Sequence, residues 1–418
     1  MTLTQWKSKS LGYILEKVVG GGTPSKANPQ YWDGDIPWAS VKDLSSTKLD
    51  DTADKISEEG LNNSASNLIP AETIVIPTRM ALGKVAITTQ AMAINQDLKA
   101  LFPSKEVCKS YLFQWLIFHA EQIASLGSGS TVKGIRLEQL KKIPFSYPTL
   151  KEEQQKIAEV LSTVDKKIDL IDQKIAETEK LKTGLMQKLF SEGVGIQDEN
   201  GEWQPHAEFE DNGLPMHWGF LKLGSVAQVT SGGTPSRKKA SFWENGTIPW
   251  ITTGEVNFNC ITNSSQKITD EGLKNSAAKM FPPDTILMAM YGQGQTRGRV
   301  AMLGIEASTN QACAAIICSK KLNPHFCYHY LSSQYEKIRA IGNEGSQKNL
   351  NGQIIKDILI PCPNLEEQEQ IALVLSTVDE KITLLAKQKS ETQQLKKGLM
   401  QKLLTGEWRV PVEETEAA

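Results

Sequence analysis

Apolar residues recur at alternating steps of four and three positions over two long stretches of the chain. One stretch runs from Ile157 to Ile175 and the other from Ile371 to Leu385, with charged residues between the apolar ones. This heptad spacing predicts two long amphipathic helices, over residues 149–190 and 363–405, each with one apolar seam. The predicted seam residues are Ile157, Leu161, Val164, Ile168, Ile171, Ile175, Ile371, Leu375, Val378, Ile382 and Leu385.

An apolar seam on a helix needs a partner that covers it. Because the two seams agree in length and register, we expect the two helices to pair with each other as a coiled coil. A pseudo-two-fold relation between the two halves of the chain would make the paired helices antiparallel. The alternative is that each helix packs on the domain next to it. A helix of some 40 residues is about 60 Å long, which would make it a ruler between two globular domains.

The remainder of each half is predicted to be a mixed region of strands and helices. Short apolar runs bounded by Gly, Pro and Asn predict strands at 73–76, 85–87, 285–288 and 314–317. One helix is expected in each half, near 110–125 and 325–341. The fold class is therefore α+β, with two similar globular domains and two long helices.

The two halves repeat each other in sequence. The run Gly21-Gly22-Thr23-Pro24-Ser25 returns at 232–236, Ile36-Pro37-Trp38 returns at 248–250, and Gly184-Leu185-Met186-Gln187-Lys188-Leu189 returns at 398–403. The period is about half the chain, so the repeating unit is a domain, a helix and a short tail, related by a pseudo-two-fold. The predicted segments are a first domain at 1–148, a helix at 149–190, a linker at 191–214, a second domain at 215–362, a helix at 363–405 and a tail at 406–418.

Composition places the chain among ordinary globular proteins. Of 418 residues, 39% are hydrophobic and 22% are charged, and the net charge is −2. No apolar run has the roughly 20 residues of a membrane helix, and the first residues lack a secretion signal core. The six cysteines are split unevenly and form no Cys-x-x-Cys pair, which argues against a disulfide framework or a zinc site. A cytoplasmic location without membrane contact is expected.

The Gly-Gly-Thr-Pro-Ser segments are the first candidates for contact with nucleic acid. Backbone amides and hydroxyls of such a loop can donate to phosphates. The favoured alternative is a tight turn that needs positive φ at glycine, followed by a bend fixed by proline. The candidate phosphate-binding residues are Thr23, Ser25, Lys26, Thr234, Ser236, Arg237 and Lys238.

The loop after the 73–76 strand and its counterpart are the candidates for base recognition. Residues 77–84 and 290–299 follow matching strands, yet they differ in length and content. Arginine and glutamine side chains can recognise guanine and adenine edges, although an ordinary solvated hairpin is the alternative. The residues selected here are Arg79, Lys84, Tyr291, Gln293, Gln295, Arg297 and Arg299.

A third pair of segments precedes the long helices, at 128–136 and 344–351. Small hydroxyl residues with a nearby lysine suit contacts to backbone phosphates, and a polar connecting loop explains the pattern equally well. The candidates are Thr131, Lys133, Arg136, Ser346, Lys348 and Asn349.

Taken together, these motifs resemble the specificity subunits of type I restriction-modification enzymes. The resemblance rests on the paired Gly-Gly-Thr-Pro-Ser and Ile-Pro-Trp blocks, on the helix starts at 148–154 and 363–368, and on the shared Gly-Leu-Met-Gln-Lys-Leu helix ends. It covers nearly the whole chain.

The resemblance implies that each globular region reads one half of a split site in double-stranded DNA. It also implies that the helices set the spacing and dock two methyltransferase (modification) subunits, through which restriction (translocase and nuclease) subunits join. The chain itself would then be non-catalytic and need no cofactor. S-adenosylmethionine, ATP and Mg would belong to its partners.

Two other classes of function are weighed against this reading. A self-contained methyltransferase or nuclease needs a methyl-donor loop or a carboxylate metal cluster, and neither pattern is found. The Asn28-Pro29-Gln30-Tyr31 run is close to an amino-methyltransferase motif, but the repeat does not keep it. His325 and His329, four apart, are read as packing and surface residues and not as metal ligands, so no metal is expected. A purely structural coiled-coil scaffold would show no DNA sequence preference.

Overall fold

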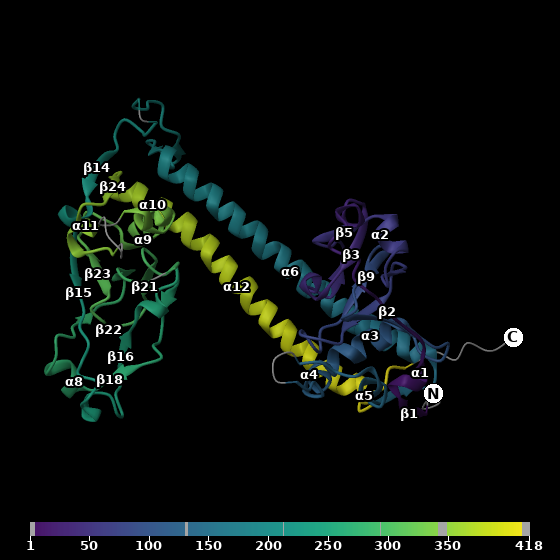
Figure 1. Cartoon of the computed structure of the whole chain (residues 1–418). Helices are drawn as coiled ribbons and strands as arrows, with labels where there is room; N and C mark the ends of the chain where they lie inside the picture. The colour runs from purple at the N-terminus through teal and green to yellow at the C-terminus, as the bar shows by residue number, and fades with distance from the viewer. Residues whose placement is uncertain (1–4, 130–132, 212, 293, 342–348, 412–418) are drawn as a thin grey trace. The chain divides into compact units, whose positions relative to one another are not determined.

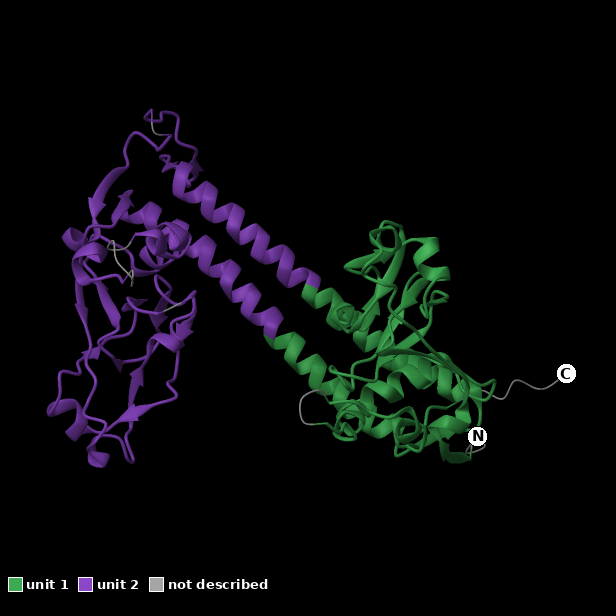
Figure 2. Cartoon of the chain, in the orientation of Figure 1, with its two compact units in different colours: residues 1–172, 387–418 green, residues 173–386 purple. Residues whose placement is uncertain are grey.

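A computed structural model of the chain describes residues 5–129, 133–211, 213–292, 294–341 and 349–411. The chain divides into two compact units, residues 1–172 with 387–418 and residues 173–386 (Figure 2). Each unit therefore contains one mixed domain and a portion of both long helices. Among the described residues, no helix combines the length and the apolar character needed to cross a membrane.

The first domain is built from two sheets and a strand pair. A five-stranded sheet has the order β2-β10-β7-β8-β4, and a four-stranded sheet has the order β5-β3-β9-β6. Most neighbours are antiparallel, whereas β3–β9 and β4–β8 are parallel. The strands are β1 Trp6–Ser10, β2 Leu15–Gly20, β3 Ile36–Ala39, β4 Lys48–Leu49, β5 Asp54–Ile56, β6 Asn67–Ile69, β7 Ile74–Pro77, β8 Ala86–Thr88, β9 Met92–Ile94, β10 Leu98–Pro103 and β11 Pro144–Pro148, which pairs with β1.

The second domain repeats this topology strand by strand. Its sheets have the orders β15-β23-β20-β21-β17 and β18-β16-β22-β19, and β14 pairs with β24. The equal order confirms the duplication predicted from the sequence motifs. The strands are β14 Gly219–Lys222, β15 Ala227–Ser231, β16 Ile248–Ile251, β17 Cys260–Ile261, β18 Lys267–Ile268, β19 Met280–Phe281, β20 Ile286–Ala289, β21 Val300–Leu303, β22 Ala307–Thr309, β23 Cys313–Cys318 and β24 Leu359–Cys362. A further hairpin, β12 Ile196–Gln197 with β13 Trp203–Gln204, lies in the predicted linker.

The single helix predicted within each domain is two short helices. The first domain breaks at His119, whose ring stacks on Trp115 with centroids 3.8 Å apart, and the second breaks at Gln334. The short helices are α1 Leu11–Ile14, α2 Glu58–Asn62, α3 Lys109–Phe118, α4 Ala120–Ser125 and α5 Leu137–Lys141, and then α7 Leu223–Val226, α8 Asp270–Lys274, α9 Pro324–Ser333, α10 Tyr335–Ala340 and α11 Gly352–Lys356. The 3₁₀ helices are η1 Pro29–Trp32, η2 Val41–Asp43, η3 Ala240–Phe242 and η4 Thr253–Glu255.

The long helices are α6, Lys151–Glu192, and α12, Leu365–Leu404 (Figure 1). In the first unit, Asp165 Oδ1 lies 2.6 Å from Lys396 Nζ, and Asp172 Oδ1 lies 2.6 Å from Lys389 Nζ. A step of seven residues forward in α6 thus matches seven residues backward in α12. The helix segments are antiparallel, as the pseudo-two-fold predicts, and they pair in a heptad register, as the seams predict.

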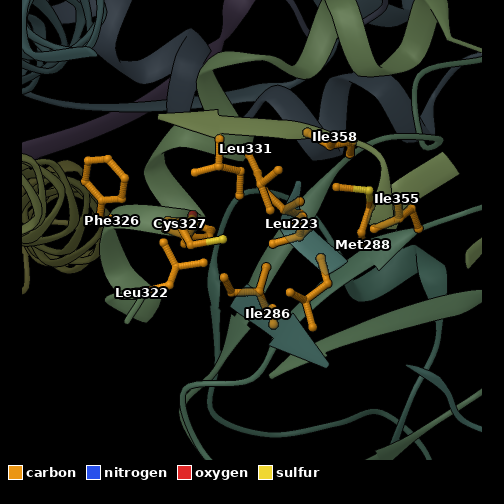
Figure 3. Close-up of a cluster of buried hydrophobic side chains, with 14 of the residues drawn as sticks. Leu223, Ile286, Met288, Leu322, Phe326, Cys327, Leu331, Ile355 and Ile358 are labelled. Carbon is orange, nitrogen blue, oxygen red and sulfur yellow. The ribbon is translucent and has the colours of Figure 1, made fainter. Parts of the chain in front are cut away.

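The start of each seam packs in the core of its own domain as well as against the other helix. In the second unit, Ile371 and Leu375 of α12 join a core that includes Leu223, Ile286 and Phe326 (Figure 3). The end of α6 enters the same core through Leu189 and Phe190. The first unit has the equivalent arrangement with the roles of the helices exchanged: Ile157 and Leu161 of α6 share its core with Met400, Leu403 and Leu404 of α12. Each helix therefore packs both on its own domain and against the other helix, which combines the two alternatives considered from the sequence.

The later seam positions are less covered than the first ones. Ile171 and Leu385 are buried. The remaining seam residues are partly buried, namely Val164, Ile168, Ile175, Val378 and Ile382.

A buried glutamine fixes each helix start to its domain. Gln154 Oε1 accepts from Cys108 N at 2.7 Å, and its Nε2 donates to Glu106 O and Pro148 O. Gln368 makes the same three contacts in the repeat, with Asn323, Lys321 and Pro363. Because the amide satisfies three backbone groups that no helix or strand would satisfy, it determines where the chain turns into the helix.

A buried carboxylate beside each glutamine holds the tail that follows the other long helix. Glu367 accepts from Val194 N, Gly195 N and Trp218 Nε1, and lies 2.8 Å from His206 Nε2. In the first unit, Glu153 accepts from Nε and Nη2 of Arg409 at 2.7 and 2.8 Å. Gly193 and Gly406 follow the two helices at positive φ, and a Cβ at either would lie within 3 Å of the equivalent tryptophan ring, that of Trp218 or Trp6.

A polar side chain of each domain meets the ion pair between the helices. Gln114 Nε2 donates to Asp165 Oδ2 at 3.0 Å in the first unit. His329 takes the place of this glutamine in the second unit, 3.8 Å from Asp379, which pairs with Lys182 at 2.5 Å. Burial, with a smaller effect from Lys182, lowers the pKa of His329 to about 3, so the imidazole is neutral at physiological pH.

Candidate nucleic-acid interface

The candidate segments of the first domain meet at the turn between β9 and β10. Thr23 Oγ1, from the Gly-Gly-Thr-Pro-Ser loop, donates to Gln96 Oε1 at 2.5 Å. Thr78 N donates to Asp97 O at 2.7 Å, and Arg79 Nη1 lies 3.9 Å from Asp97 Oδ1. The turn therefore brings the first two predicted segments to one edge of the domain.

The third segment joins the same edge through the second one. Met80 N donates to Lys133 O, and Ile135 N donates to Thr78 O, both at 3.0 Å. Arg79 and Gly134 form an antiparallel bridge. The described parts of all three segments of the first domain thus adjoin one another.

The second domain has the same arrangement around the turn between β22 and β23. Thr234 Oγ1 donates to Gln311 Oε1. Met290 N donates to Ala312 O at 2.9 Å, and Leu350 N donates to Met290 O at 3.0 Å. The hydrogen bonds that join the segments to this turn, here called the frame of the surface, therefore occur in both domains, although the loops that they hold differ.

Close backbone approach, and not positive φ, explains the glycines of the Gly-Gly-Thr-Pro-Ser loops. Neither Gly21 nor Gly232 has positive φ, which corrects the turn predicted from sequence. A Cβ at Gly21 would lie 1.8 Å from Ile94 O, and one at Gly232 would lie 1.9 Å from Thr309 O. The loop lies directly on the neighbouring strand end, so only glycine fits there.

Two tryptophans hold each of these loops in place. Trp38 Nε1 donates to Gly22 O at 3.0 Å, and Trp32 Nε1 donates to Ser25 O at 3.3 Å. Trp250 and Trp243 make the equivalent bonds to Gly233 and Ser236 in the second domain. Each pair of rings packs edge to face with centroids 5.0 Å apart. The loops are therefore fixed before any ligand binds.

Basic residues of the first segments lie at the surface near these rings. The Arg237 guanidinium stacks 3.6 Å above the Trp243 ring, and Lys26 Nζ lies 5.8 Å from the Trp32 ring. A cation held on an indole face keeps its outer edge available for an anion. The exposed members of the predicted set are Thr23, Ser25, Lys26, Thr234, Ser236, Arg237 and Lys238.

The predicted cations of the other two segments in the first domain are also exposed. Arg79, Lys133 and Arg136 have exposed side chains, while Lys84 Nζ donates to Leu44 O at 2.7 Å. Met80 is exposed and has positive φ, which is rare for a residue with a side chain. Thr131 lies outside the described residues, as do Gln293, Ser346 and Lys348 of the second domain; Asn349 is described and half-buried.

The loop 290–299 is held from within by its own arginines. Arg297 Nη2 donates to Arg339 O of α10 at 2.8 Å, and Arg299 donates to Asn257 Oδ1 and to Gln295 Oε1. Tyr291 and Gln295 are exposed. Arg297 is therefore directed toward α10, whereas Tyr291 and Gln295 lie on the surface.

Sequence reasoning missed the two glutamines at the centre of this surface, Gln96 and Gln311. Each follows an asparagine that caps its turn, Asn95 or Asn310, and each is exposed. The signal was present as a repeated Asn-Gln pair at the same position of both halves. It is short, and its partners Thr23 and Thr234 lie more than 70 residues away.

Comparison with known proteins gives the family. The family described as Type I restriction modification DNA specificity domain matches residues 4–180 and 215–394, so the chain belongs to it. The chain is similar to the MjaIX specificity subunit of Methanocaldococcus jannaschii, with 26% identity over 97% of this chain and 94% of that protein. It is also similar to the EcoR124I/EcoR124II specificity subunit of Escherichia coli, with 34% identity over 38% of this chain and 40% of that protein.

The fold agrees with solved structures from type I restriction-modification systems. The crystal structure of the S subunit of a type I restriction-modification system from M. genitalium has a TM-score of 0.63 to this chain, with 17% identity over 96% of each chain. A chain from a study of complex assembly in the type I system has a TM-score of 0.58, with 15% identity over 98% of this chain and all of that one. Both show the fold that this chain shares.

Proposed function

We propose that this chain is the DNA-reading subunit of a type I restriction-modification complex, and that each domain reads one half of a bipartite site in double-stranded DNA. The observation that carries the proposal is the duplicated frame with divergent loops. Thr23–Gln96 and Thr234–Gln311 form the same surface twice, whereas 77–84 and 290–299 differ in length and content. Two domains with the same frame but different loops suit a DNA site whose two halves differ in sequence.

The long helices are proposed to set the spacing of the two half-sites and to bind two methyltransferase subunits. Restriction subunits would join through these partners. S-adenosylmethionine, ATP and Mg would serve the partners, and this chain would perform no catalysis. The matched family and the named specificity subunits that the chain resembles support the role in DNA specificity.

Co-expression of this chain with its methyltransferase subunit tests the proposal directly. Sequencing of the host DNA for N6-methyladenine should reveal one bipartite motif with a fixed gap, and the motif should vanish when this chain is omitted. Methylation without sequence preference would favour a structural scaffold. Tight S-adenosylmethionine binding by the chain alone would favour a self-contained enzyme.

Alanine substitutions in the loop 290–299 are expected to change preference in the second half-site alone. Gln295 presents an exposed amide, and Arg299 donates to it, so the pair can offer a fork to a base edge. A bidentate base contact is worth about 1–3 kcal/mol of discrimination. We expect Gln295→Ala or Arg299→Ala to relax one or two positions of that half-site, measured by selection from randomised duplexes.

Arg297→Ala is the matched comparison for these variants. Its guanidinium binds Arg339 O and holds the loop on α10, so its loss should weaken binding to every duplex alike. The same uniform loss in Gln295→Ala and Arg299→Ala would make the loop a positioning element. Relaxed preference in the first half-site would contradict the assignment of loops to half-sites.

The helices expose a duplicated set of residues suited to binding a partner. In the first unit, Leu170 and Leu395 are 56% and 55% exposed; in the second, Leu384 and Leu181 are 56% and 54% exposed. Gly184 and Gly398 lie three residues after Leu181 and Leu395, and a Cβ at either would meet no described atom within 4 Å beyond its neighbours and the adjacent helix backbone. Helical glycine costs about 1 kcal/mol relative to alanine, and packing within the described chain does not explain it.

Two equal sets of exposed leucines predict two equal partners. Leu170→Glu with Leu395→Glu should reduce the complex from two methyltransferase subunits per chain to one, as measured by native mass spectrometry. Leu384→Glu with Leu181→Glu should do the same, because a buried charge opposes association. Combining all four substitutions should leave the chain without partners.

Leu373→Glu is the control for this experiment. Leu373 is 58% exposed on α12, and the equivalent position of α6 already carries Glu159. A duplicated site cannot depend on a leucine that only one copy has, so two partners should remain bound. One partner per chain in the parent protein, or loss of a partner in Leu373→Glu, would contradict the proposal.

A further inference from the structure

The two domains share one threonine–glutamine pair, and an identical pair suits a ligand that both half-sites have in common. Thr23 with Gln96 and Thr234 with Gln311 have the same identities and the same hydrogen bond in both domains. The neighbouring loops differ between the domains, which is what reading different bases requires. Side chains that stay the same beside loops that change therefore suit the invariant part of DNA, its sugar–phosphate backbone.

The geometry of each glutamine leaves hydrogen-bond donors directed to the outside. The threonine hydroxyl donates to Oε1, so the amide carbonyl is occupied from within the domain. Both side chains are exposed, and among the described residues their only side-chain hydrogen bonds are those of Oε1 to the threonines, which leaves Nε2 without a partner. An amide group of this kind can donate two hydrogen bonds to an acceptor such as a phosphate oxygen.

The backbone beneath each glutamine is fixed in advance. Asn95 Oδ1 accepts from Asp97 N and Leu98 N at 3.0 and 3.1 Å, and Asn310 Oδ1 accepts from Ala312 N at 3.0 Å. The tryptophans hold the threonine-bearing loop on the other side. Because little freedom remains to be lost on binding, a neutral contact there can contribute usefully to affinity.

We propose that Gln96 and Gln311, held by Thr23 and Thr234, bind one DNA backbone phosphate each at equivalent places in the two half-sites. The proposal rests on the proposed function and extends it, because it separates a common positioning contact from the contacts that read bases. It gives both domains the same docking register on DNA, against which the loops 77–84 and 290–299 then read different sequences.

Gln311→Ala and Gln96→Ala, each in the full complex with its methyltransferase subunits, test the proposal. A hydrogen bond to a charged group is strong enough that its loss should weaken binding to a pool of random-sequence duplexes by about tenfold or more. The weakening should be equal for all sequences, so the preferred motif recovered from the pool should not change. Because glutamine is neutral, the salt dependence of binding should stay as in the parent.

Lys26→Ala and Arg237→Ala are the charged comparison. If these cations touch phosphates, each variant should weaken binding and also lower the salt dependence by about one released ion. Gln96→Glu and Gln311→Glu keep the side-chain size and an acceptor for the threonine hydroxyl, but they replace the amide donors by negative charge. They should bind more weakly than the alanine variants. Thermal unfolding of each variant checks that its domain is intact.

Methylphosphonate substitution identifies the contacted group. The parent should lose affinity when one particular phosphate of each half-site is replaced by a neutral methylphosphonate, and the matching glutamine variant should not lose further affinity there. A change of preferred base in Gln96→Ala or Gln311→Ala would show a base contact and overturn the proposal. Unchanged affinity in both variants would also overturn it. If the parent itself showed no sequence preference, the proposed function would fail instead.

Discussion

Glu367→Ala is expected to lower the free energy of unfolding of the second unit by about 3–5 kcal/mol, because alanine removes the acceptor that several buried donors share. Glu367 is 2% exposed, and its two oxygens are shared among four donors. These are Val194 N at 3.0 Å, Gly195 N at 3.1 Å, His206 Nε2 at 2.8 Å and Trp218 Nε1 at 2.9 Å.

The size of the effect follows from what alanine would leave behind. Each buried donor without an acceptor costs about 1–3 kcal/mol, and the costs do not add fully because the tail can relax into water. The tail after α6 would therefore separate from the start of α12. Denaturant unfolding gives the free energy, and amide hydrogen exchange over 193–206 should show protection lost in that segment first.

Glu366→Ala is the matched control, since Glu366 is the neighbouring residue on the same helix and is exposed. It should change the stability by less than about 0.5 kcal/mol, as surface substitutions usually do. Equal stability of the two variants, or unchanged exchange over 193–206, would show that the carboxylate does not fasten the tail.

Adding one heptad to both long helices is expected to lengthen the unread gap of the DNA site by about three base pairs. The insertion is a second copy of residues 173–179 in α6 and of residues 381–387 in α12. Seven residues lengthen a helix by about 10.5 Å, which is about three base pairs at 3.4 Å each. The insertions fall between Asp172 and Lys182 in α6 and between Asp379 and Lys389 in α12, so every ion pair between the helices keeps its partner.

The bases recognised in each half-site should stay the same in this variant, because neither domain is altered. Three base pairs also rotate one half-site by roughly 100° about the DNA axis, so the affinity for the longer site should be lower than the parent's for its own. Selection from duplexes with a randomised gap length, or methylation sequencing, measures the preferred gap.

Insertion into α6 alone is the control for helix length. It places Lys182 one heptad out of step with Asp379, so the antiparallel register is lost and binding to any bipartite site should fall. An unchanged gap in the double insertion would rule out the role of the helices as a ruler.

The sequence alone was sufficient for the duplication, the α+β class, the two long helices and their antiparallel pairing. These features depend on periodicity and on repeated motifs, which are local or are compared directly between halves. The heptad steps from Ile157 and from Ile371 show an apolar face wherever the helix lies. The paired Gly-Gly-Thr-Pro-Ser blocks likewise indicated a duplicated loop before any contact was known.

Other features were decided only by tertiary contacts. The periodicity that predicts a seam does not say what covers it, and Ile157 and Leu161 pack on their own domain together with the end of α12. The same holds for the reason behind the loop glycines. Gly21 is required because Ile94 O of a distant strand lies too close for a Cβ, and no local pattern carries that information.

The central glutamines and the buried carboxylates likewise could not be identified from the sequence. Gln96 gains its meaning from Thr23, and Glu367 from His206 and Trp218, all far away in sequence. In the sequence each is one polar residue among many, since polar residues occur both on surfaces and in buried networks. Only the fold brings their hydrogen-bond partners within reach, and the burial of Glu367 and the exposure of Gln96 then decide which one fastens the chain and which one can meet DNA.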